Sequence, residues 1–187
     1  EFAVDGRKLY YEAFPDLTPT VYLRTEVMNN TALPWLEGES QIFYEGEYNG
    51  KVTLAETLSG STADVVLGTS QDMNVKKTLV KKYDDTSGLF GSKKRRKFDY
   101  RISVQNNSSE ARTLQLYDRI PVSRNKKIVV ELTNLSRAFD ARREDEIEQY
   151  EQGRRSWKLP LQAAEKIEIS YTVVVTWESD VRVSGIN

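Results

Sequence analysis

The chain of 187 residues contains neither histidine nor cysteine. Histidine is the usual general base of enzymes, and Ser–His and Cys–His pairs are the usual activated nucleophiles. Zinc, copper and non-haem iron sites also depend on these two side chains. The composition therefore predicts a non-enzymatic protein with no catalytic residues and no cofactor, and it leaves only oxygen ligands for calcium or magnesium.

Long apolar runs are absent as well. No stretch reaches the roughly 18 residues that a membrane-spanning helix needs. The chain begins Glu1-Phe2-Ala3-Val4-Asp5 without a signal peptide, as expected of a piece excised from a longer protein whose targeting signals lie elsewhere. A protein without cysteine fits a reducing cytoplasm and equally a bacterial envelope, so the sequence leaves both compartments open.

The charges are unevenly distributed along the chain. Residues 1–92 carry 8 Lys or Arg against 14 Asp or Glu, a formal charge of −6. Residues 93–187 carry 19 against 14, a formal charge of +5. We favour the interpretation that the two halves attract each other or that their loops simply differ in charge. The alternative is a basic binding face on the second half.

Apolar and polar residues alternate over most of the chain, which is typical of antiparallel strands with one solvent-exposed face. In one stretch Ile167, Ile169, Tyr171, Val173 and Val175 occupy alternate positions. Turn residues such as Asn29-Asn30, Asp84-Asp85 and Asn106-Asn107 separate the runs. The expected strands lie near 8–14, 20–28, 40–45, 48–54, 62–67, 72–82, 98–105, 111–117, 127–133, 156–161 and 166–177, with a weak last one near 181–184.

This spacing predicts an all-β fold, an antiparallel β-sandwich-type domain over residues 1–187 that can divide into two abutting lobes, 1–90 and 98–187. One segment breaks the pattern. Residues 136–152 are densely charged and have Phe139, Ile147 and Tyr150 at roughly helical spacing before Gly153. We expect a short surface helix or an ordered loop there, ending at the glycine. No internal repeat of fixed period is evident.

Acidic clusters and acid pairs are the remaining chemical candidates. Asp84-Asp85 and Glu144-Asp145-Glu146 are acidic, but neither matches an EF-hand loop, and such runs are usually solvated surface. A carboxylate pair for glycoside hydrolysis stays open, because acids are plentiful and sequence spacing does not show which of them meet in space.

The strongest local charge feature is the basic run Lys93-Lys94-Arg95-Arg96-Lys97. It could attach the protein to anionic lipid, nucleic acid or acidic polysaccharide. No aromatic residue is interleaved with it, which argues against nucleic acid as a partner. We expect it to lie on a solvated hairpin loop.

Two other charged residues have structural interpretations. Asp118 follows a clear strand in Asp118-Arg119-Ile120-Pro121-Val122-Ser123, and we expect its side chain to bond its own backbone at the start of a turn rather than act in catalysis. Arg24 lies inside a strand-like run, where pairing with a carboxylate across the sheet is more plausible than ligand binding.

Aromatic residues leave a carbohydrate role open. Trp35, Trp157 and Trp177, together with ten tyrosines, could stack on sugars, although aromatics also fill β cores. Trp157 shares a face with Leu159 and Leu161, which predicts a core position. Glycosylation tripeptides begin at Asn29, Asn106, Asn107 and Asn134, and they matter only in a secretory eukaryotic context.

The order of several motifs resembles that of one known family. The motifs are Tyr22 to Val27 with Asn29, Thr31, Leu33-Pro34 and Leu36-Glu37-Gly38; Ile42 to Gly50; Leu67-Gly68 with Asp72; Tyr100 to Asn106; Asp118 to Ser123; Trp157 to Leu159 through Glu165; and Tyr171 to Val175. In this order they resemble the C-terminal β-rich domain of the mucoidy-inhibitor A-like proteins. Trp35 and the charged stretch 137–155 depart from the family pattern.

The resemblance implies a larger protein with a smaller N-terminal domain and a coiled-coil segment before a β-rich domain such as this one. The family name implies a link to suppression of mucoid exopolysaccharide in bacteria, but no catalytic or binding residues to carry over. We therefore expect a protein-interaction or scaffold module that binds a protein partner or itself. The alternative is a carbohydrate-related envelope protein that binds or hydrolyses glycans.

Overall fold

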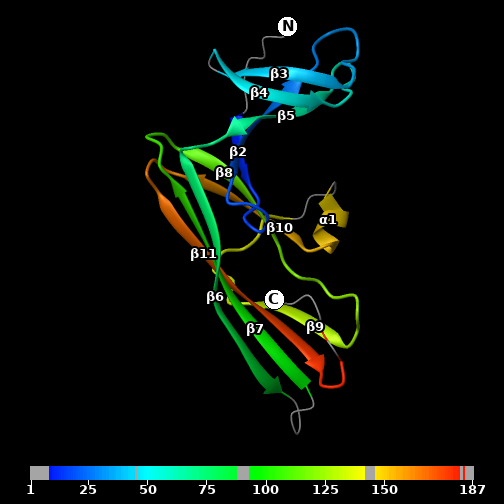
Figure 1. Ribbon diagram of the computed structural model, residues 1–187, viewed down its shortest axis with the longest axis vertical. Helices are drawn as coiled ribbons and strands as arrows, with labels where there is room; N and C mark the ends of the chain where they lie inside the picture. Colours follow the sequence, from blue (N-terminus) through cyan, green and yellow to red (C-terminus); the bar gives the residue numbers. More distant parts are fainter. Residues whose placement is uncertain (1–8, 45, 88–92, 142–145, 182, 184–187) are drawn as a thin grey trace.

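The computed structural model describes residues 9–44, 46–87, 93–141, 146–181 and 183, and within them it is an all-β structure with one short helix (Figure 1). These residues form two large sheets and a separate hairpin. The strands are β1 (Leu9–Ala13), β2 (Val21–Met28), β3 (Gly38–Tyr44), β4 (Glu47–Leu54), β5 (Thr62–Thr69), β6 (Met73–Ser87), β7 (Lys93–Asn106), β8 (Arg112–Arg119), β9 (Ile128–Thr133), β10 (Arg154–Leu161) and β11 (Lys166–Glu178). The expected all-β fold with abutting sheets is confirmed.

Every strand expected from the alternating pattern except the weak last one is present, with ends that differ by a few residues. The largest differences are in β6, which continues to Ser87, and in β7, which begins at Lys93. Both extensions are rich in charge, which is the reason that the sequence suggests a turn and a loop there. The weak last segment is not a strand at its described residues, Val181 and Val183.

The two large sheets have the strand orders β10-β8-β1-β2-β5 and β6-β7-β11-β9. The described strand pairs are antiparallel except for β1 and β8, which run parallel with Tyr11 opposite Leu114. This parallel pair departs from the antiparallel arrangement expected. Both sheets combine strands from residues 1–90 with strands from 98–187, and the division of the chain into domains stays a prediction.

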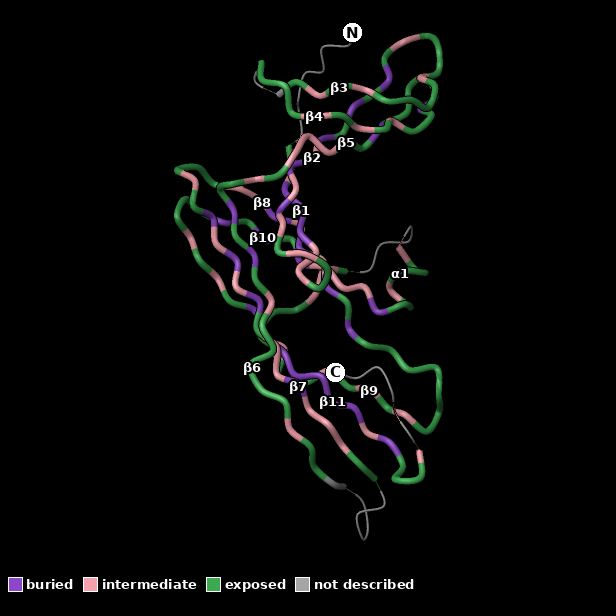
Figure 2. The backbone as a smooth tube through the Cα atoms, viewed as in Figure 1, coloured by how far each residue is buried: buried purple, intermediate pink, exposed green. Residues whose placement is uncertain are grey.

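The main core lies between the inner faces of the two large sheets, where the alternate residues of the long strands are buried (Figure 2). Each large side chain enclosed in this way contributes about 1.5–3 kcal/mol to folding. Trp157 is 1% exposed, which confirms its predicted core position. The most enclosed core residues include Ile102, Val104, Leu114, Leu116, Leu159, Ile169 and Val173.

A smaller unit, which we call the outer lobe, comprises residues 29–61 and contains the hairpin β3–β4 (Figure 1). Its hairpin packs Ile42, Val52 and Leu54 over a second, smaller core formed by β2 and β5. Gly50, with a φ of 109°, lies at the β-bulge of this hairpin, where a left-handed conformation favours glycine. The outer lobe therefore has its own packing, carried on the ends of two strands of the five-stranded sheet.

The charged segment before β10 forms a helix only at α1 (Ile147–Glu151). Residues 136–141 are irregular chain, and residues 142–145 lie outside the described part. The helix ends before Gly153, as expected, and this glycine has a φ of 94°. A Cβ at this position would lie 2.0 Å from the carbonyl oxygen of Ile120, so only glycine fits. Among the described residues no helix has the length and apolar character to span a membrane.

Candidate functional site

A buried ionic cluster connects the two large sheets. The Asp118 carboxylate, whose side chain is fully enclosed, comes from β8 in the five-stranded sheet. Lys77 Nζ of β6 lies 2.6 Å from Asp118 Oδ1, and the Tyr171 hydroxyl of β11 donates to Asp118 Oδ2 at 2.5 Å. The Arg119 backbone N–H also donates to Oδ1 at 2.8 Å. The local backbone bond expected for Asp118 is present, to the N–H of the next residue, but Asp118 lies within β8 rather than at the start of a turn. The sequence does not reveal its contacts with the other sheet.

The electrostatics of this cluster favour a structural role. Burial and the negative charge of Asp118 raise the pKa of the Tyr171 hydroxyl, which therefore remains a donor. Lys77 Nζ also lies 4.8 Å from the centre of the Tyr100 ring, a cation–π contact. Partial burial, and secondarily the charge of Asp118, raise the pKa of Asp16. Both oxygens of Asp118 are occupied by protein donors, so the cluster fastens the sheets and offers no carboxylate oxygen to a substrate.

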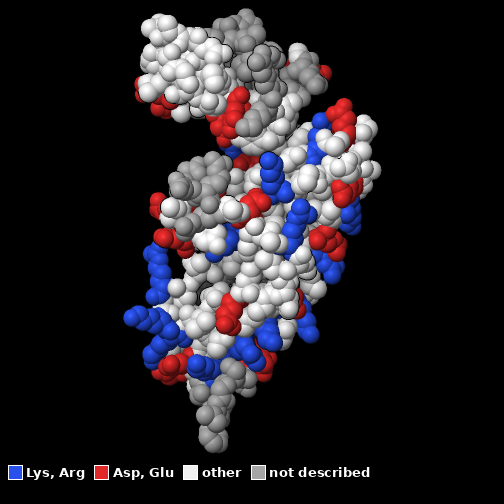
Figure 3. Space-filling view, turned by 180° about the vertical axis from the view of Figure 1, so that it is seen from behind, with Lys and Arg blue, Asp and Glu red and all other residues white. Residues whose placement is uncertain are grey.

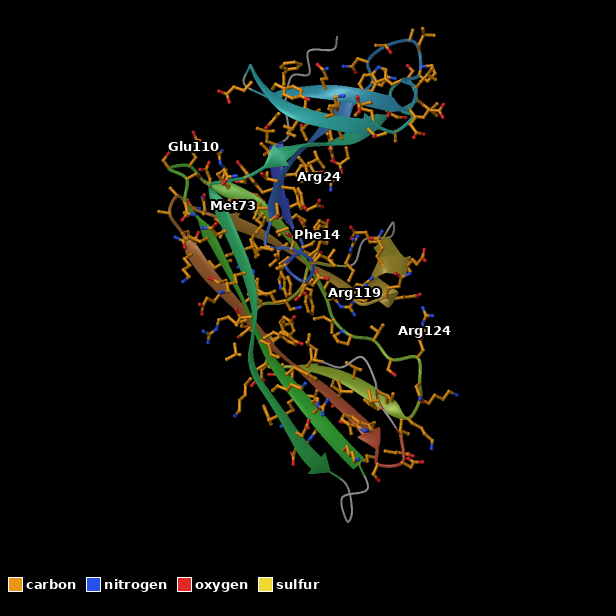
Figure 4. All side chains as sticks on the ribbon, in the orientation of Figure 1. Phe14, Arg24, Met73, Glu110, Arg119 and Arg124 are labelled. Atoms are coloured by element: carbon orange, nitrogen blue, oxygen red, sulfur yellow. The ribbon has the colours of Figure 1, made fainter. Side chains whose placement is uncertain are left out.

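Arg24 bridges two carboxylates on the outer face of the five-stranded sheet, just below the outer lobe (Figure 4). One guanidinium nitrogen contacts Glu12 of β1 and the other lies 2.5 Å from Asp64 of β5. The Tyr10 hydroxyl donates to Asp64 at 2.6 Å, and burial together with this bond raises the pKa of Tyr10. The predicted pairing of Arg24 across the sheet is confirmed.

A small depression lies beside α1. Its lining includes Tyr117, Asp140, Tyr150, Arg154 and Arg155. The cations are already engaged: Arg154 donates to Gln149 Oε1 at 2.6 Å, and the Arg155 guanidinium stacks 3.6 Å from the Tyr150 ring centre. Asp140 accepts from the Gln115 side-chain amide at 3.0 Å. Apart from Glu146, which also lines it, the charged groups of this depression are already bonded within the protein.

The basic run and the acidic pair lie opposite each other on neighbouring strands. Arg95 is paired in register with Asp85, and Arg96 with Asp84. Arg95 donates to Asp85 at 2.7 Å, while Arg96 donates through two nitrogens to both oxygens of Asp84 at 2.5 and 2.9 Å. Bonding to Arg96 lowers the pKa of Asp84. The prediction of a loop for residues 93–97 was therefore wrong, because cross-strand ion pairs extend β6 and β7 through both charged segments.

No group of three or more acids among the described residues is arranged to hold a metal ion. Of the second acidic cluster expected from the sequence, Glu144 and Asp145 lie outside the described residues. Two of the three tryptophans are core residues: Trp177 is 8% exposed, and the indole N–H of Trp157 donates to the Arg137 carbonyl at 3.1 Å. Neither of them can serve as a sugar-stacking platform.

A fully buried asparagine, Asn29, organises the loops of the outer lobe directly after β2. Its amide nitrogen donates to the carbonyls of Leu33 at 3.0 Å and Thr57 at 2.9 Å. Its Oδ1 accepts from the backbone and hydroxyl of Thr31 at 3.0 and 2.7 Å. The backbone N–H of Asn29 donates to Ser61, which leads into β5. One side chain thus fixes both loops at the base of the hairpin.

The same arrangement recurs around Asn106, the last residue of β7. Its amide nitrogen donates to the carbonyls of Glu110 and Gln162, both at 2.8 Å. Its Oδ1 accepts from the backbone and hydroxyl of Ser108 at 3.1 and 2.8 Å, and its backbone N–H donates to Glu165, which leads into β11. The signal in the sequence is the doubled Asn-Asn-Thr and Asn-Asn-Ser, which was interpreted only as turns and glycosylation tripeptides.

The two asparagine loops differ in the side chains that they carry. Leu33 and Glu110 correspond, because the carbonyl of each accepts a hydrogen bond from the asparagine amide. Leu58 and Ala163 correspond, because each directly follows the residue whose carbonyl accepts the second bond. Leu33 is 74% exposed and Leu58 is 61% exposed, and the neighbouring Leu36 is 78% exposed. We call these three leucines the leucine platform. The shared scaffold does not require leucine at these positions, since Glu and Ala serve in its counterpart.

The charges around the leucine platform are acidic. Exposed Glu37 follows Leu36 directly in the sequence, and exposed Glu56 lies two residues before Leu58. Lys51, the one basic residue of the outer lobe, is bonded to Glu39 at 2.6 Å. On the face that Figure 3 shows, the outer lobe has acidic and uncharged surface, while Lys and Arg side chains, with acidic ones among them, are spread over the rest of the molecule. The platform is therefore an apolar surface in an acidic setting.

Comparison with known proteins gives one match. A family model described as a domain of unknown function, DUF4139, matches residues 13–179. No curated protein and no solved structure matches the chain significantly. The matched region includes both asparagine loops, the buried cluster and the leucine platform.

Proposed function

The chain belongs to the DUF4139 family, and we propose that it is a non-catalytic protein-interaction module that docks a partner through the leucine platform. The observation that carries this proposal is the contrast between the two asparagine loops. Both loops have the same hydrogen-bonded scaffold, but only the Asn29 loops expose leucines. Exposed apolar groups gathered on one surface are typical of interaction sites.

The rigidity of the Asn29 loops supports the same function. Besides the bonds of Asn29, the Ser59 hydroxyl donates to the Thr31 carbonyl at 2.6 Å, and Trp35 and Thr57 exchange backbone hydrogen bonds of 2.9 and 3.0 Å. A surface that is already ordered loses little conformational entropy when it binds. The lobe is therefore suited to present the three leucines in one fixed arrangement.

We further infer that this module belongs to a larger scaffold protein of the mucoidy-inhibitor A-like kind, in which it follows a coiled-coil segment. The ordered motifs that carry this resemblance fall between Tyr22 and Val175, inside the region matched by the family model. The non-catalytic role is supported by the interior charges, because Asp118 and Lys77 are bonded to each other.

A carbohydrate-related role is the second candidate, and one observation favours it. Phe43 and Tyr48 form an edge-to-face pair with ring centres 5.6 Å apart, and they are 63% and 55% exposed. Exposed aromatic rings can stack on sugar faces. Binding on a glycan array that is lost in Phe43→Ala/Tyr48→Ala would support this role, and a blank array would remove it.

Site-specific photo-crosslinking tests the proposed function. A photoreactive amino acid replaces Leu58 in one variant and Ala163, its counterpart in the Asn106 loops, in a matched control. We expect the protein with the probe at 58 to form a discrete covalent adduct with a protein in its host cells, and Leu33→Glu/Leu36→Glu to abolish it. The control should form none. Equal adducts at both positions, or none at 58, would contradict the proposal.

A further inference from the structure

We propose that the partner of the leucine platform is the basic end of a second copy of this chain, so that copies associate head to tail. This inference rests on the proposed docking function and names its occupant. The basic end consists of the far part of the β6–β7 pair, residues 81–87 and 93–97. Its Lys and Arg side chains complement an acidic apolar surface at the other end of the molecule.

The positions of the two surfaces require a second copy. The outer lobe and the far end of β6–β7 lie at opposite ends of the longest axis of the molecule (Figure 1). No bending of a single chain with continuous sheets could bring them together. A contact between them must therefore form between molecules, and a joined pair of copies keeps one unused platform and one unused basic end.

The charges of the basic end are only partly neutralised within the molecule. Residues 81–97 contain seven Lys or Arg against two Asp, and Arg95 and Arg96 are bonded to the two aspartates. Lys93 and Lys94 are exposed, and the structure shows no ion pair for either among the described residues. Glu178, which is opposite Lys93, lies 3.3 Å from Lys127. Two cations thus remain available to Glu37 and Glu56 of a neighbouring copy.

Apolar material accompanies these cations. The aliphatic stems of lysines pack on apolar surfaces while the ammonium group stays in water. The basic end therefore offers positive charge together with the aliphatic stems of its exposed lysines, which can cover the leucines of the platform.

This contact is heterologous, because two different surfaces meet. A heterologous contact does not close by twofold symmetry, and it produces rings or open chains of copies. Pairing of two leucine platforms would instead give a closed dimer and would bring the acidic residues of both copies together. Charge complementarity favours the head-to-tail arrangement over that alternative.

Sedimentation velocity over a concentration series tests the inference. The platform variant is Leu33→Glu/Leu36→Glu/Leu58→Glu, and the basic-end variant is Lys93→Glu/Lys94→Glu. All five side chains are exposed, so circular dichroism should show unchanged folding. Matched controls are Ala163→Glu in the Asn106 loops and Lys158→Glu/Lys166→Glu, which reverses two exposed lysines elsewhere. We expect the wild-type mass to rise with concentration beyond a dimer, and each variant to associate at least tenfold more weakly while both controls do not change.

Mixing the two variants gives the decisive readout. Each alone should be monomeric, but together they keep one intact platform and one intact basic end, and they should form a 1:1 dimer that grows no further. Raising the salt from about 0.05 M to about 0.5 M should weaken this dimer, since exposed charges are screened. A monomeric mixture, or a wild type that stays monomeric at every concentration, would overturn the inference.

Two further results separate the alternatives. A basic-end variant that still dimerises like the wild type would indicate pairing between leucine platforms and would overturn the head-to-tail contact. If the crosslinker at position 58 captures a different protein and never another copy, the inference fails while the proposed docking function stands. If it captures nothing, both fail.

Discussion

Lys77 and Asp118 form an ion pair of 2.6 Å inside the sandwich, one from each large sheet. Removing one member of a buried ion pair leaves the other charge without compensation, which costs about 3–5 kcal/mol. We therefore expect Asp118→Ala to lower the free energy of unfolding by about that amount in urea titrations.

The paired replacement Lys77→Met/Asp118→Leu removes both charges and should cost less than Asp118→Ala alone. The exposed pair of Lys51 and Glu39 is the control, and Lys51→Ala should change stability by less than about 1 kcal/mol. If Asp118→Ala and Lys51→Ala had similar effects, the buried pair would not fasten the sheets as we describe.

Tyr171 gives the protein a specific response to alkaline pH. Its pKa is raised by burial and by Asp118, so above about pH 10 the unfolded chain releases a proton that the native state retains. Stability should therefore be unaffected by this group below pH 9 or so, and should fall by about 1.4 kcal/mol per pH unit above pH 10. The pKa values of Tyr10, Tyr11 and Tyr100 are raised as well, so these residues make stability fall more steeply with pH.

The test compares urea unfolding of wild type and Tyr171→Phe between pH 7 and pH 11. At neutral pH the variant should be less stable by about 1 kcal/mol, because it lacks the hydrogen bond to Asp118. Above pH 10 this gap should narrow and then reverse, since phenylalanine has no proton to lose. Parallel curves over the whole range would show that the Tyr171 hydroxyl is not held protonated by the fold.

The strands could be predicted from the sequence because each buries one face. The run Ile167, Ile169, Tyr171, Val173 and Val175 shows this directly: all but Ile167 are fully buried, and Ile167 packs against the same core. The far ends of β6 and β7 could not be predicted, because their stability comes from ion pairs between residues that are only revealed by strand register. A basic run and an acidic pair each resemble a loop until they are placed opposite one another.

The leucine platform could not be predicted for a different reason. Leu33, Leu36 and Leu58 look like core residues in a list of apolar positions, and nothing local shows that they face solvent. Their exposure becomes evident only when Asn29 is seen to hold the loops from beneath. Similarly, Lys77 and Tyr171 come from distant strands, and no spacing along the chain connects them to Asp118.

The paired charges on β6 and β7 lead to a prediction about anionic surfaces. Arg95 and Arg96 are occupied by Asp85 and Asp84, so they contribute little to attraction at a distance. We expect Asp84→Asn/Asp85→Asn to increase retention on acidic liposomes, because it frees both guanidinium groups. Removal of both whole pairs in Asp84→Asn/Asp85→Asn/Arg95→Ser/Arg96→Ser should change retention little, because it leaves the net charge the same. Flotation at about 0.1 M salt measures this. Loss of retention in this fourfold variant would show that the paired arginines are themselves the contact.

Asn29 and Asn106 should have different consequences when replaced, although their hydrogen bonds are the same. Each alanine variant leaves buried carbonyls without donors and should cost about 2–4 kcal/mol. In Asn106→Ala the hydrogen bonds are lost where β7 and β11 of the main sandwich meet their loops. Urea unfolding should therefore show a lower free energy of unfolding for the whole protein. In Asn29→Ala the hydrogen bonds are lost within the outer lobe. Amide hydrogen exchange in β3 and β4 should therefore be faster, and the yield of crosslinking from position 58 should fall.

Neighbouring asparagines supply the matched controls. Asn30 and Asn107 are exposed, and Asn30→Ala and Asn107→Ala should be close to neutral by both measurements. Replacement by aspartate keeps the shape of the side chain but turns two donors into acceptors that face carbonyl oxygens, so Asn29→Asp should be at least as damaging as Asn29→Ala. Asn106→Ala and Asn29→Ala should be compared under conditions where both variants have the same free energy of unfolding. If both then abolished crosslinking from position 58 equally, the leucine platform would depend on the whole sandwich rather than on Asn29.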